Sequence, residues 1–359
     1  MHVPDGMINL PVSAAAGVVA AGAVAVSLRG ARRELGSGPL AEGHGAERTA
    51  PLAGLVAAFV FAVQMLNFPV AAGTSGHLLG GALAAILVGP CTGVLCIAVV
   101  LLMQGILFAD GGLTALGVNI TVMGVVTVIV SYGIFRGLLR ILPRKRRSVT
   151  VSAFVAALVS VPAAAAAFTL LYAIGGTTHI PVGKVLTAMV GVHVLIGIGE
   201  AAITALTVGA VIAVRPDLVH GARGLAAPLK LRVGGELVDA PAPAPVAAAG
   251  SRSPRGLLAA GLGTALLLAG VVSFYASASP DGLEKVAADK GIDKKVEEHA
   301  AADSPLADYG IEDISNTRLS GGLAGMIGVG ATVVVGSGIF YVVHRRRTPA
   351  NAPVTTGRS

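Results

Sequence analysis

The chain opens with MHVPDGMINL, and the groups of its first two residues can chelate a metal ion. The amine nitrogen of Met1 and the amide nitrogen of His2 close a five-membered ring on a metal, and that amide with His2 Nδ1 closes a six-membered one. One more imidazole would complete a square of four nitrogens, which suits Ni(II), Cu(II) or Co(II) better than Mg, Ca or Zn. A solvated histidine without any role is the alternative.

A second histidine supplies the fourth nitrogen of this predicted site. His77 stands in FPVAAGTSGHLLGG, a glycine-rich turn between two apolar stretches, where glycines let the backbone approach a ligand. We therefore expect Met1, His2 and His77 to bind the metal. Met1 is expected to stay at the mature terminus, because initiator methionine is usually trimmed only before a small residue. The opening also lacks the basic region and cleavage site of a secretory signal.

Six further polar residues stand in or beside apolar stretches, where polar groups are costly and often functional. His193 and Glu200 are seven residues apart, so they share one face of a helix and are expected to pair inside the membrane, as a structural pair or a proton relay. Four others could line the pocket or hydrogen-bond a ligating imidazole, although contacts between helices would explain them equally well: Gln64, Asn67, Ser75 and Asn119.

The remaining reactive residues have simpler explanations. Asp110 in FADGG fits a turn, and Cys91 and Cys96 fit small core residues, because CTGVLC lacks the second cysteine pair of a zinc site. The sequence contains no Walker A, GxSxG or HExxH motif, so we expect a protein that is not an enzyme. Five histidines in predicted loops and tails receive no role: His44, His179, His220, His299 and His344.

The composition is that of a membrane protein. Of the 359 residues, 54% are hydrophobic and 13% are charged, and the mean hydropathy is +0.80. We predict an all-α polytopic helical bundle embedded in lipid, with about seven spans in an amino-terminal part and two after it. The third candidate is short and glycine-rich, so a broken or re-entrant helix is an alternative there. The candidates are 10–28, 51–70, 78–88, 91–108, 113–135, 151–174, 185–214, 256–275 and 322–343.

Basic residues beside the ends of these spans indicate the orientation, because loops rich in Lys and Arg favour the cytoplasm. Clusters within 29–33, 136–147, 215–232 and 344–347 all fall on one side when the spans are counted. This predicts a multi-pass protein of the plasma membrane with its amino terminus outside and its carboxy terminus in the cytoplasm. The net charge of +7 reflects this topology, and we expect no nucleic-acid partner.

Changes in hydropathy divide the chain into four parts. We expect a substrate-binding membrane component over 1–215, followed by a cytoplasmic linker over 216–254 that contains the Pro/Ala run APAPAPVAAAG. A second unit over 255–347 has two spans and a charged, partly helical segment outside. The polar tail over 348–359 is expected to be disordered.

Several long stretches resemble one family, the substrate-specific component of energy-coupling factor importers for nickel and cobalt, the NikM/CbiM family. The matching stretches within 1–214 are MHVPDG, QMLNFPVAAGTSGHLLGGALAAILVGP, LLMQGILFADGGLTALGVNITVMG and GVHVLIGIGEAAIT. The carboxy-terminal unit, with SPDGLEKVA after its first span, resembles the small NikN/CbiN (PDGLE) partner fused to the same chain.

The resemblance implies a metal held by Met1, His2 and His77, with nickel or cobalt as the transported substrate and no other cofactor. It also implies a transmembrane coupling subunit of the Q/T type and cytoplasmic ATPase subunits of the O/A type, and a small unit that helps metal reach the site. The PDG after MHV and the fusion favour nickel, with a cobalt importer as the alternative. A membrane metal sensor or metalloenzyme is the alternative from another class.

Overall fold

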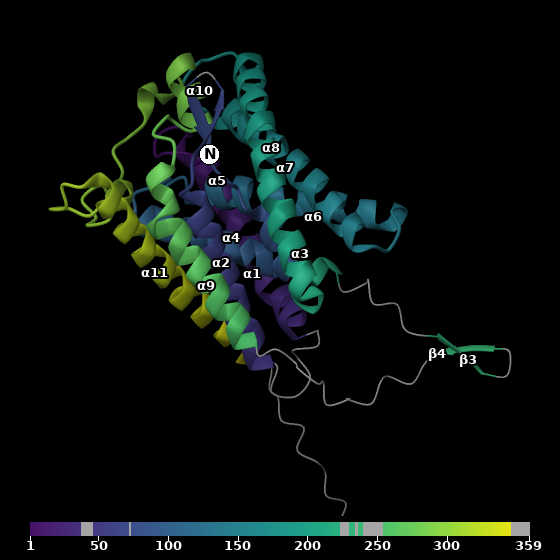
Figure 1. Ribbon diagram of the computed structural model, residues 1–359. Coiled ribbons are helices and arrows are strands. Elements are labelled where there is room, and N and C mark those ends of the chain that lie inside the picture. Colours follow the sequence, from purple (N-terminus) through teal and green to yellow (C-terminus); the bar gives the residue numbers. More distant parts are fainter. Residues whose placement is uncertain (37–45, 72, 223–229, 234–235, 240–253, 346–359) are drawn as a thin grey trace, which may run out of the picture.

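A computed structural model describes residues 1–36, 46–71, 73–222, 230–233, 236–239 and 254–345 of the chain. It confirms a polytopic helical membrane protein (Figure 1). Within the described residues, seven helices are long and apolar enough to cross a membrane. They comprise Leu10–Leu35, Pro90–Leu107, Leu116–Ile141, Arg146–Gly175, Val182–Val214, Arg255–Tyr275 and Thr317–Val343.

The described residues of the amino-terminal part form eight α-helices, interrupted by one short hairpin. The helices are α1 (Leu10–Gly36), α2 (Ala46–Gln64), α3 (Gly81–Val88), α4 (Pro90–Leu107), α5 (Leu116–Asn119), α6 (Thr127–Ile141), α7 (Arg146–Gly175) and α8 (Val182–Val214). A π-helical segment, η1 (Ile120–Val126), makes α5 and α6 one continuous span. The antiparallel hairpin is β1 (Phe68–Ala71) and β2 (Thr74–Gly76).

Two predicted spans take a different form. The second is α2, whose apolar stretch Ala50–Gln64 is shorter than the other spans, and the chain then leaves the helix for the β1–β2 hairpin. The third is α3, a fully buried helix of eight residues. Gly80 and Gly89 flank it with φ of +84° and +104°, conformations that end a helix and suit glycine. The broken-helix alternative therefore describes this segment.

The carboxy-terminal unit packs beside α2. Its elements are α9 (Pro254–Gly270), η4 (Val272–Tyr275), α10 (Gly282–Lys290), η5 (Asp293–Lys295), η6 (Ala307–Tyr309) and α11 (Thr317–Arg345). Helices α9 and α11 run along α2, while α7 packs along α8 (Figure 1). Several large apolar side chains on the spanning helices are more than two-thirds exposed and are suited to face lipid, among them Val18, Leu206 and Val334.

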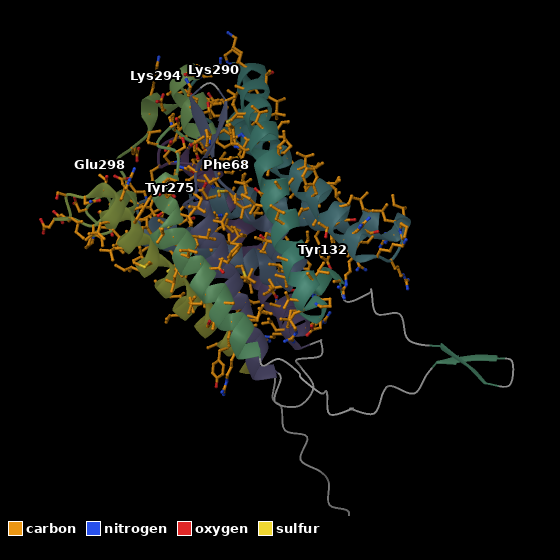
Figure 2. All side chains as sticks on the ribbon, viewed as in Figure 1. Phe68, Tyr132, Tyr275, Lys290, Lys294 and Glu298 are labelled. Carbon is orange, nitrogen blue, oxygen red and sulfur yellow. The ribbon has the colours of Figure 1, made fainter. Side chains whose placement is uncertain are left out.

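The amino terminus and α10 lie at the same end of the bundle (Figure 1). Charged side chains gather there, including Lys290 and Lys294 around α10 (Figure 2). Of the predicted linker, the described parts are η2 (Pro216–Leu218), η3 (His220–Ala222) and an antiparallel hairpin of β3 (Lys230–Val233) and β4 (Glu236–Asp239). Residues 240–253 and the predicted tail lie outside the described residues.

Candidate metal site

The first residues of the chain form an extended segment held by several backbone contacts. Asn119 clamps Val3 from both sides: its Oδ1 accepts the Val3 N–H at 2.8 Å, and its Nδ2 donates to the Val3 carbonyl at 3.1 Å. Further along, Ile8 forms an isolated bridge with Gly176. The Val3 carbonyl also accepts the Gly112 N–H at 2.9 Å, whereas the buried Val3 N–H would lose its partner without Asn119. Asn119, predicted as a pocket residue, therefore fixes the segment that carries Met1 and His2.

Asp5 fastens the same segment to the loop after α4. Its carboxylate accepts the N–H groups of Leu113 and Thr114 and the Thr114 hydroxyl, at 3.2, 2.8 and 2.5 Å. Gly6 follows with a φ of +78°, and a Cβ there would lie 2.3 Å from the Lys295 carbonyl oxygen. Only glycine allows this turn beside the carboxy-terminal unit.

The turn that carries His77 is fixed by two side chains from neighbouring helices. Glu200 of α8 accepts the backbone N–H groups of Leu79 and Gly80 at 2.7 and 3.1 Å. Gln64, at the end of α2, donates its Nε2 to the Leu79 carbonyl at 2.9 Å. These bonds replace the ladder or helix partners that this irregular backbone lacks. His77 is thereby presented from a rigid turn.

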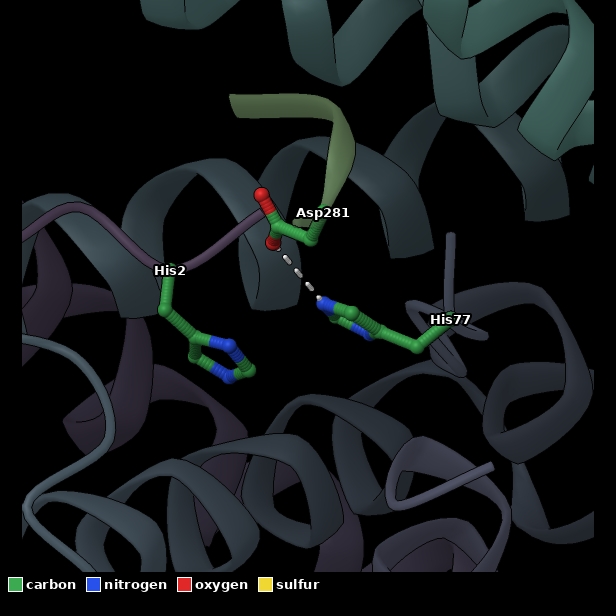
Figure 3. Close-up of side chains that lie close together, drawn as sticks. All are labelled: His2, His77 and Asp281. Atoms are coloured by element: carbon green, nitrogen blue, oxygen red, sulfur yellow. Dashed lines mark ion pairs between the residues drawn. The ribbon is translucent and has the colours of Figure 1, made fainter. Parts of the chain in front are cut away.

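Met1, His77 and Asp281 meet at the centre of the site. The Met1 amine nitrogen lies 2.5 Å from His77 Nε2 and 2.7 Å from Asp281 Oδ2, and Met1 is only 3% exposed. His77 Nε2 lies 3.5 Å from the same Oδ2 (Figure 3). His77 Nδ1 donates to the Leu78 carbonyl at 3.0 Å, which directs a lone pair of Nε2 toward the amine.

His2 lies beside this group, with its ring stacked on that of His77 at a centroid distance of 5.0 Å. One ligand atom each from His2, His77 and Asp281 can be chosen so that all lie within 4.8 Å of one another. Nitrogen and carboxylate donors at this spacing form a group that could hold a transition-metal ion.

The partners of the His2 ring constrain its protonation. Nδ1 lies 3.1 Å from Asp110 Oδ1, and Nε2 lies 3.2 Å from Gln104 Oε1. Burial lowers the pKa of His2 to about 4, even though Asp110 acts in the opposite direction, so the ring is neutral at pH 7. Of the two neutral tautomers, one donates Nδ1–H to Asp110 and the other donates Nε2–H to Gln104; the chelate requires the second, which leaves a lone pair on Nδ1.

Asp281 comes from the carboxy-terminal unit and is the N-cap of α10. Its Oδ1 accepts the Glu284 N–H at 2.8 Å, and the Glu284 carboxylate accepts the Asp281 N–H at 2.9 Å, which completes a capping box. Burial acts to raise the pKa of Asp281, but the Met1 ammonium and His77 outweigh it and hold this pKa well below its usual range. One carboxylate oxygen thus caps the helix and the other faces the site.

Ser75 holds this loop in place. Its N–H donates to the Pro280 carbonyl at 2.9 Å, and its hydroxyl donates to the Ser279 carbonyl at 2.7 Å. The predicted pocket residue therefore connects the β1–β2 hairpin to the turn that presents Asp281. The backbone carbonyl of Asn67 likewise accepts the Ser277 N–H at 2.7 Å, which gives a second bond between this region and the segment that leads to Asp281.

A cavity of about 900 Å³ opens beside His2 and His77, between the two units. Gln64 and Asn67 also line it. Five carboxylate residues line this cavity. Asp110 belongs to the amino-terminal part, and the other four belong to the carboxy-terminal unit: Asp281, Glu284, Asp293 and Asp308. This wall makes the cavity attractive to cations.

The predicted pair of His193 and Glu200 is not formed. Glu200 binds the turn after His77, and His193 Nδ1 donates to the Met189 carbonyl at 2.7 Å in its own helix. Lying on the same face of a helix does not make these two side chains pair, because each one hydrogen-bonds to nearby backbone groups instead. Asp110, expected to serve a turn, instead faces His2 and accepts the Tyr309 hydroxyl at 2.6 Å. Cys96 is buried in the core, as expected.

Sequence reasoning missed Asp281 and Gln104. The pattern from Asp281 to Glu284 is a capping-box signature and could have located the start of α10. No local signal indicates that Oδ2 reaches Met1, 280 positions earlier in the chain.

The fold and these groups define a multi-pass helical membrane protein with a cluster of side chains at one end that could hold a metal ion. The family model described as the cobalt uptake substrate-specific transmembrane region matches residues 2–218, and the PDGLE domain matches residues 255–345. The chain therefore belongs to the CbiM family and also carries a PDGLE domain, which confirms the resemblance drawn from its motifs.

Relatives and one solved structure are similar to the chain. A candidate metal transport protein of Haloquadratum walsbyi is 39% identical over 219 residues, covering 61% of this chain and 93% of the relative. A candidate fused nickel transport protein NikMN of Archaeoglobus fulgidus is 36% identical over 225 residues, covering 61% and 68%. A crystal structure of a transition metal transporter has a TM-score of 0.52 at 26% identity, covering 60% of this chain and 93% of that chain.

Proposed function

We propose that this chain is the substrate-binding membrane subunit of an ATP-driven energy-coupling factor importer for nickel or cobalt. The ion is captured outside the plasma membrane, where the amino terminus lies, and the carboxy terminus is cytoplasmic. In this proposal, movement of the ion is driven by partner proteins, a transmembrane coupling subunit and cytoplasmic ATPase subunits.

The contact between the Met1 amine and His77 Nε2 is the observation that carries this proposal. With metal–nitrogen bonds of about 2 Å, neighbouring corners of a coordination square lie about 2.8 Å apart. The 2.5 Å separation of these two buried nitrogens is close to that spacing. The amide and Nδ1 of His2 supply the other two corners, because both are tied to the amine through the covalent chain. Gln104 then accepts the Nε2–H of the ligating ring.

Nickel is the favoured substrate, with cobalt as the alternative. The fused arrangement of the two units is shared with a relative named for nickel transport, whereas the family description names cobalt uptake. Nitrogen ligation in a square suits both ions. Competition among Ni(II), Co(II), Cu(II) and Zn(II) for the purified protein would rank them directly.

The decisive test adds one residue ahead of Met1. We expect this extension to abolish uptake of radioactive nickel by the complete complex and to reduce binding to the purified subunit by more than about 100-fold, because the amine loses its place in the chelate. Full uptake by a protein whose added residue is verified by mass spectrometry would refute the site.

The fourth nitrogen is tested separately. His77→Ala should weaken nickel binding by about 100-fold or more in calorimetry while expression stays near normal. His179→Ala is the matched control, because His179 is exposed and lies outside the cluster. Equal binding by the two variants would assign the fourth corner to another group.

A further inference from the structure

Asp281 presents a carboxylate oxygen to the terminal chelate from the other unit of the chain. Its Oδ1 caps α10 by accepting the Glu284 N–H at 2.8 Å. Its Oδ2 takes no part in this cap and lies 2.7 Å from the Met1 amine and 3.5 Å from His77 Nε2 (Figure 3). Because the cap holds Oδ1 and Asp281 is buried, Oδ2 is presented in one orientation, toward atoms that are expected to bind the ion.

The distances among the amine, His77 Nε2 and Asp281 Oδ2 fit a single metal ion. They are 2.5, 2.7 and 3.5 Å, so the circle through the three atoms has a radius of about 1.8 Å. A point about 1 Å above the plane of these atoms lies about 2 Å from each of them, which is the usual length of a metal bond to nitrogen or carboxylate oxygen. One ion can therefore bind all three atoms with little movement of their residues.

The square of nitrogens leaves a position for this oxygen. If the Met1 amine, the two nitrogens of His2 and His77 Nε2 occupy the four corners, one position remains on each side of the square. With bonds of about 2 Å, such a position lies about 2.8 Å from every corner. The 2.7 Å from Oδ2 to the amine matches this spacing, and the 3.5 Å to His77 Nε2 needs only a small shift.

Charge gives a second reason for a carboxylate at this position. A divalent ion bound to the deprotonated amide of His2 and to three neutral nitrogens carries one net positive charge. Met1 and His77 are only 3% and 5% exposed, and an unpaired charge among such buried groups is costly. In the metal-free protein Asp281 pairs with the Met1 ammonium, which also carries one positive charge. Asp281 therefore faces the same net charge before and after the ion binds.

We propose that Asp281 Oδ2 is a fifth ligand of the transported ion, bound on one side of the square of nitrogens. This inference rests on the proposed function, because the ion is the one captured by the terminal chelate. The Met1 ammonium and the His2 amide each lose one proton to water when the ion binds, and no electron is transferred. The PDGLE unit thus contributes a ligand, and the site is incomplete without it.

The experiment compares variants of the full chain that are titrated with Ni(II). Asp281→Asn keeps the volume and the N-cap but loses the charge, and Asp281→Ser keeps the N-cap with a side chain too short to reach the ion. Glu284→Gln is the matched control, because it removes a neighbouring charge and retains the capping box. Calorimetry measures affinity. X-ray absorption at the nickel edge reports the geometry, because a planar ion shows a pre-edge shoulder that a fifth ligand suppresses.

The expected result differs in sign from that of a simple ion pair. We expect both Asp281 variants to bind Ni(II) about 100-fold more weakly than the wild type, and Asp281→Ser to show the planar shoulder that the wild type lacks. Glu284→Gln should change the affinity by less than about fivefold. A carboxylate that only paired with the ammonium would favour the protonated amine and compete with the ion. Its removal would then leave nickel binding unchanged or make it tighter.

Each outcome decides a different statement. A planar shoulder in the wild type, or an Asp281→Asn variant that binds nickel as tightly as the wild type or more tightly, overturns the fifth ligand. Nickel binding by four nitrogens alone would leave the proposed function in place. If the wild type binds neither Ni(II) nor Co(II), the proposed function falls as well. Melting curves in detergent check that the variants fold, so that a loss of affinity at an unchanged melting temperature supports the lost ligand.

Discussion

The PDGLE unit contacts the rest of the chain at two places that use different chemistry. Along the apolar helices, α11 lies against α2 through close contacts of small residues, as at Gly54 with Ser337 and Gly328 with Phe61. Outside the spans, the contacts include hydrogen bonds and ion pairs, such as Asp281 with the Met1 amine and with His77, and Tyr309 with Asp110. The first interface depends on shape, whereas the second depends on particular donors and acceptors.

The difference indicates that the helix interface mainly contributes to stability, whereas the interface outside the spans mainly positions the candidate metal ligands. In lipid, close packing of small residues holds helices together without directional groups. At the end of the bundle that carries the amino terminus, several bonds involve a candidate ligand or a residue close to one, such as Asp281 with Met1 and Ser75 with Pro280. We therefore expect changes in the helices to alter stability first and changes at the end that carries the amino terminus to alter metal binding first.

The largest effect should come from filling the helix interface. A Cβ at Gly328 would lie 2.2 Å from the Phe61 ring, so Gly328→Leu should destabilise the packing of α11 on α2 by about 3 kcal/mol. Thermal denaturation in detergent measures this loss. Gly330→Leu is the control, because nothing lies within 4 Å of a Cβ there. Similar melting temperatures for the two variants would contradict a tightly packed interface.

A smaller effect on stability, but a direct one on binding, is expected at Asn119. Asn119→Ala leaves the buried N–H of Val3 without a partner, although the Val3 carbonyl still accepts the Gly112 N–H, and this costs about 2 kcal/mol in docking of the first residues. Nickel affinity should fall by about 30-fold, because 1.4 kcal/mol corresponds to a factor of 10. Calorimetry measures this, with Asn316→Ala at the exposed start of α11 as control. If both variants bind nickel equally well, the clamp has no part in holding the ligands.

The smallest effect is a dependence on pH. The pKa of His2 is lowered to about 4 from 6.5, so the undocked terminus binds a proton more readily than the docked one between these values. Docking is then fully stable above about pH 6.5 and weakens as the pH falls toward 4, by about 1 kcal/mol at pH 5.5. The ion pair of Asp281 persists in this window, because its pKa is lowered and its contribution is lost only at more acidic pH.

Hydrogen exchange of the first residues at pH 7 and 5.5 checks this dependence. The metal-free wild type should lose protection at the lower pH more than His2→Gln, which carries no titrating ring at that position. An equal loss in both proteins would assign the pH dependence to another group.

Much of the fold could be predicted because its signals are local. Long apolar stretches predict spans, and Gly80 and Gly89 flank the short α3 that the glycine-rich stretch suggested. The predicted pairing of His193 with Glu200 was wrong, because helix periodicity shows which residues share a face but not which backbone groups lie beside them. Both lie on one helix face, but backbone groups from the same helix and from the turn after His77 reach them first.

The sequence by itself determined the helical membrane class, the family and the proximity of the Met1 amine to the nitrogens of His2, because covalent bonds enforce that proximity. Only the tertiary structure decided that Asp281 of the second unit faces the amine, that Gln104 meets the His2 ring and that His193 lines the same small pocket as Met1 and Asp281. These groups come from distant parts of the chain. Their meeting depends on how helices pack against one another, which no short stretch of residues encodes.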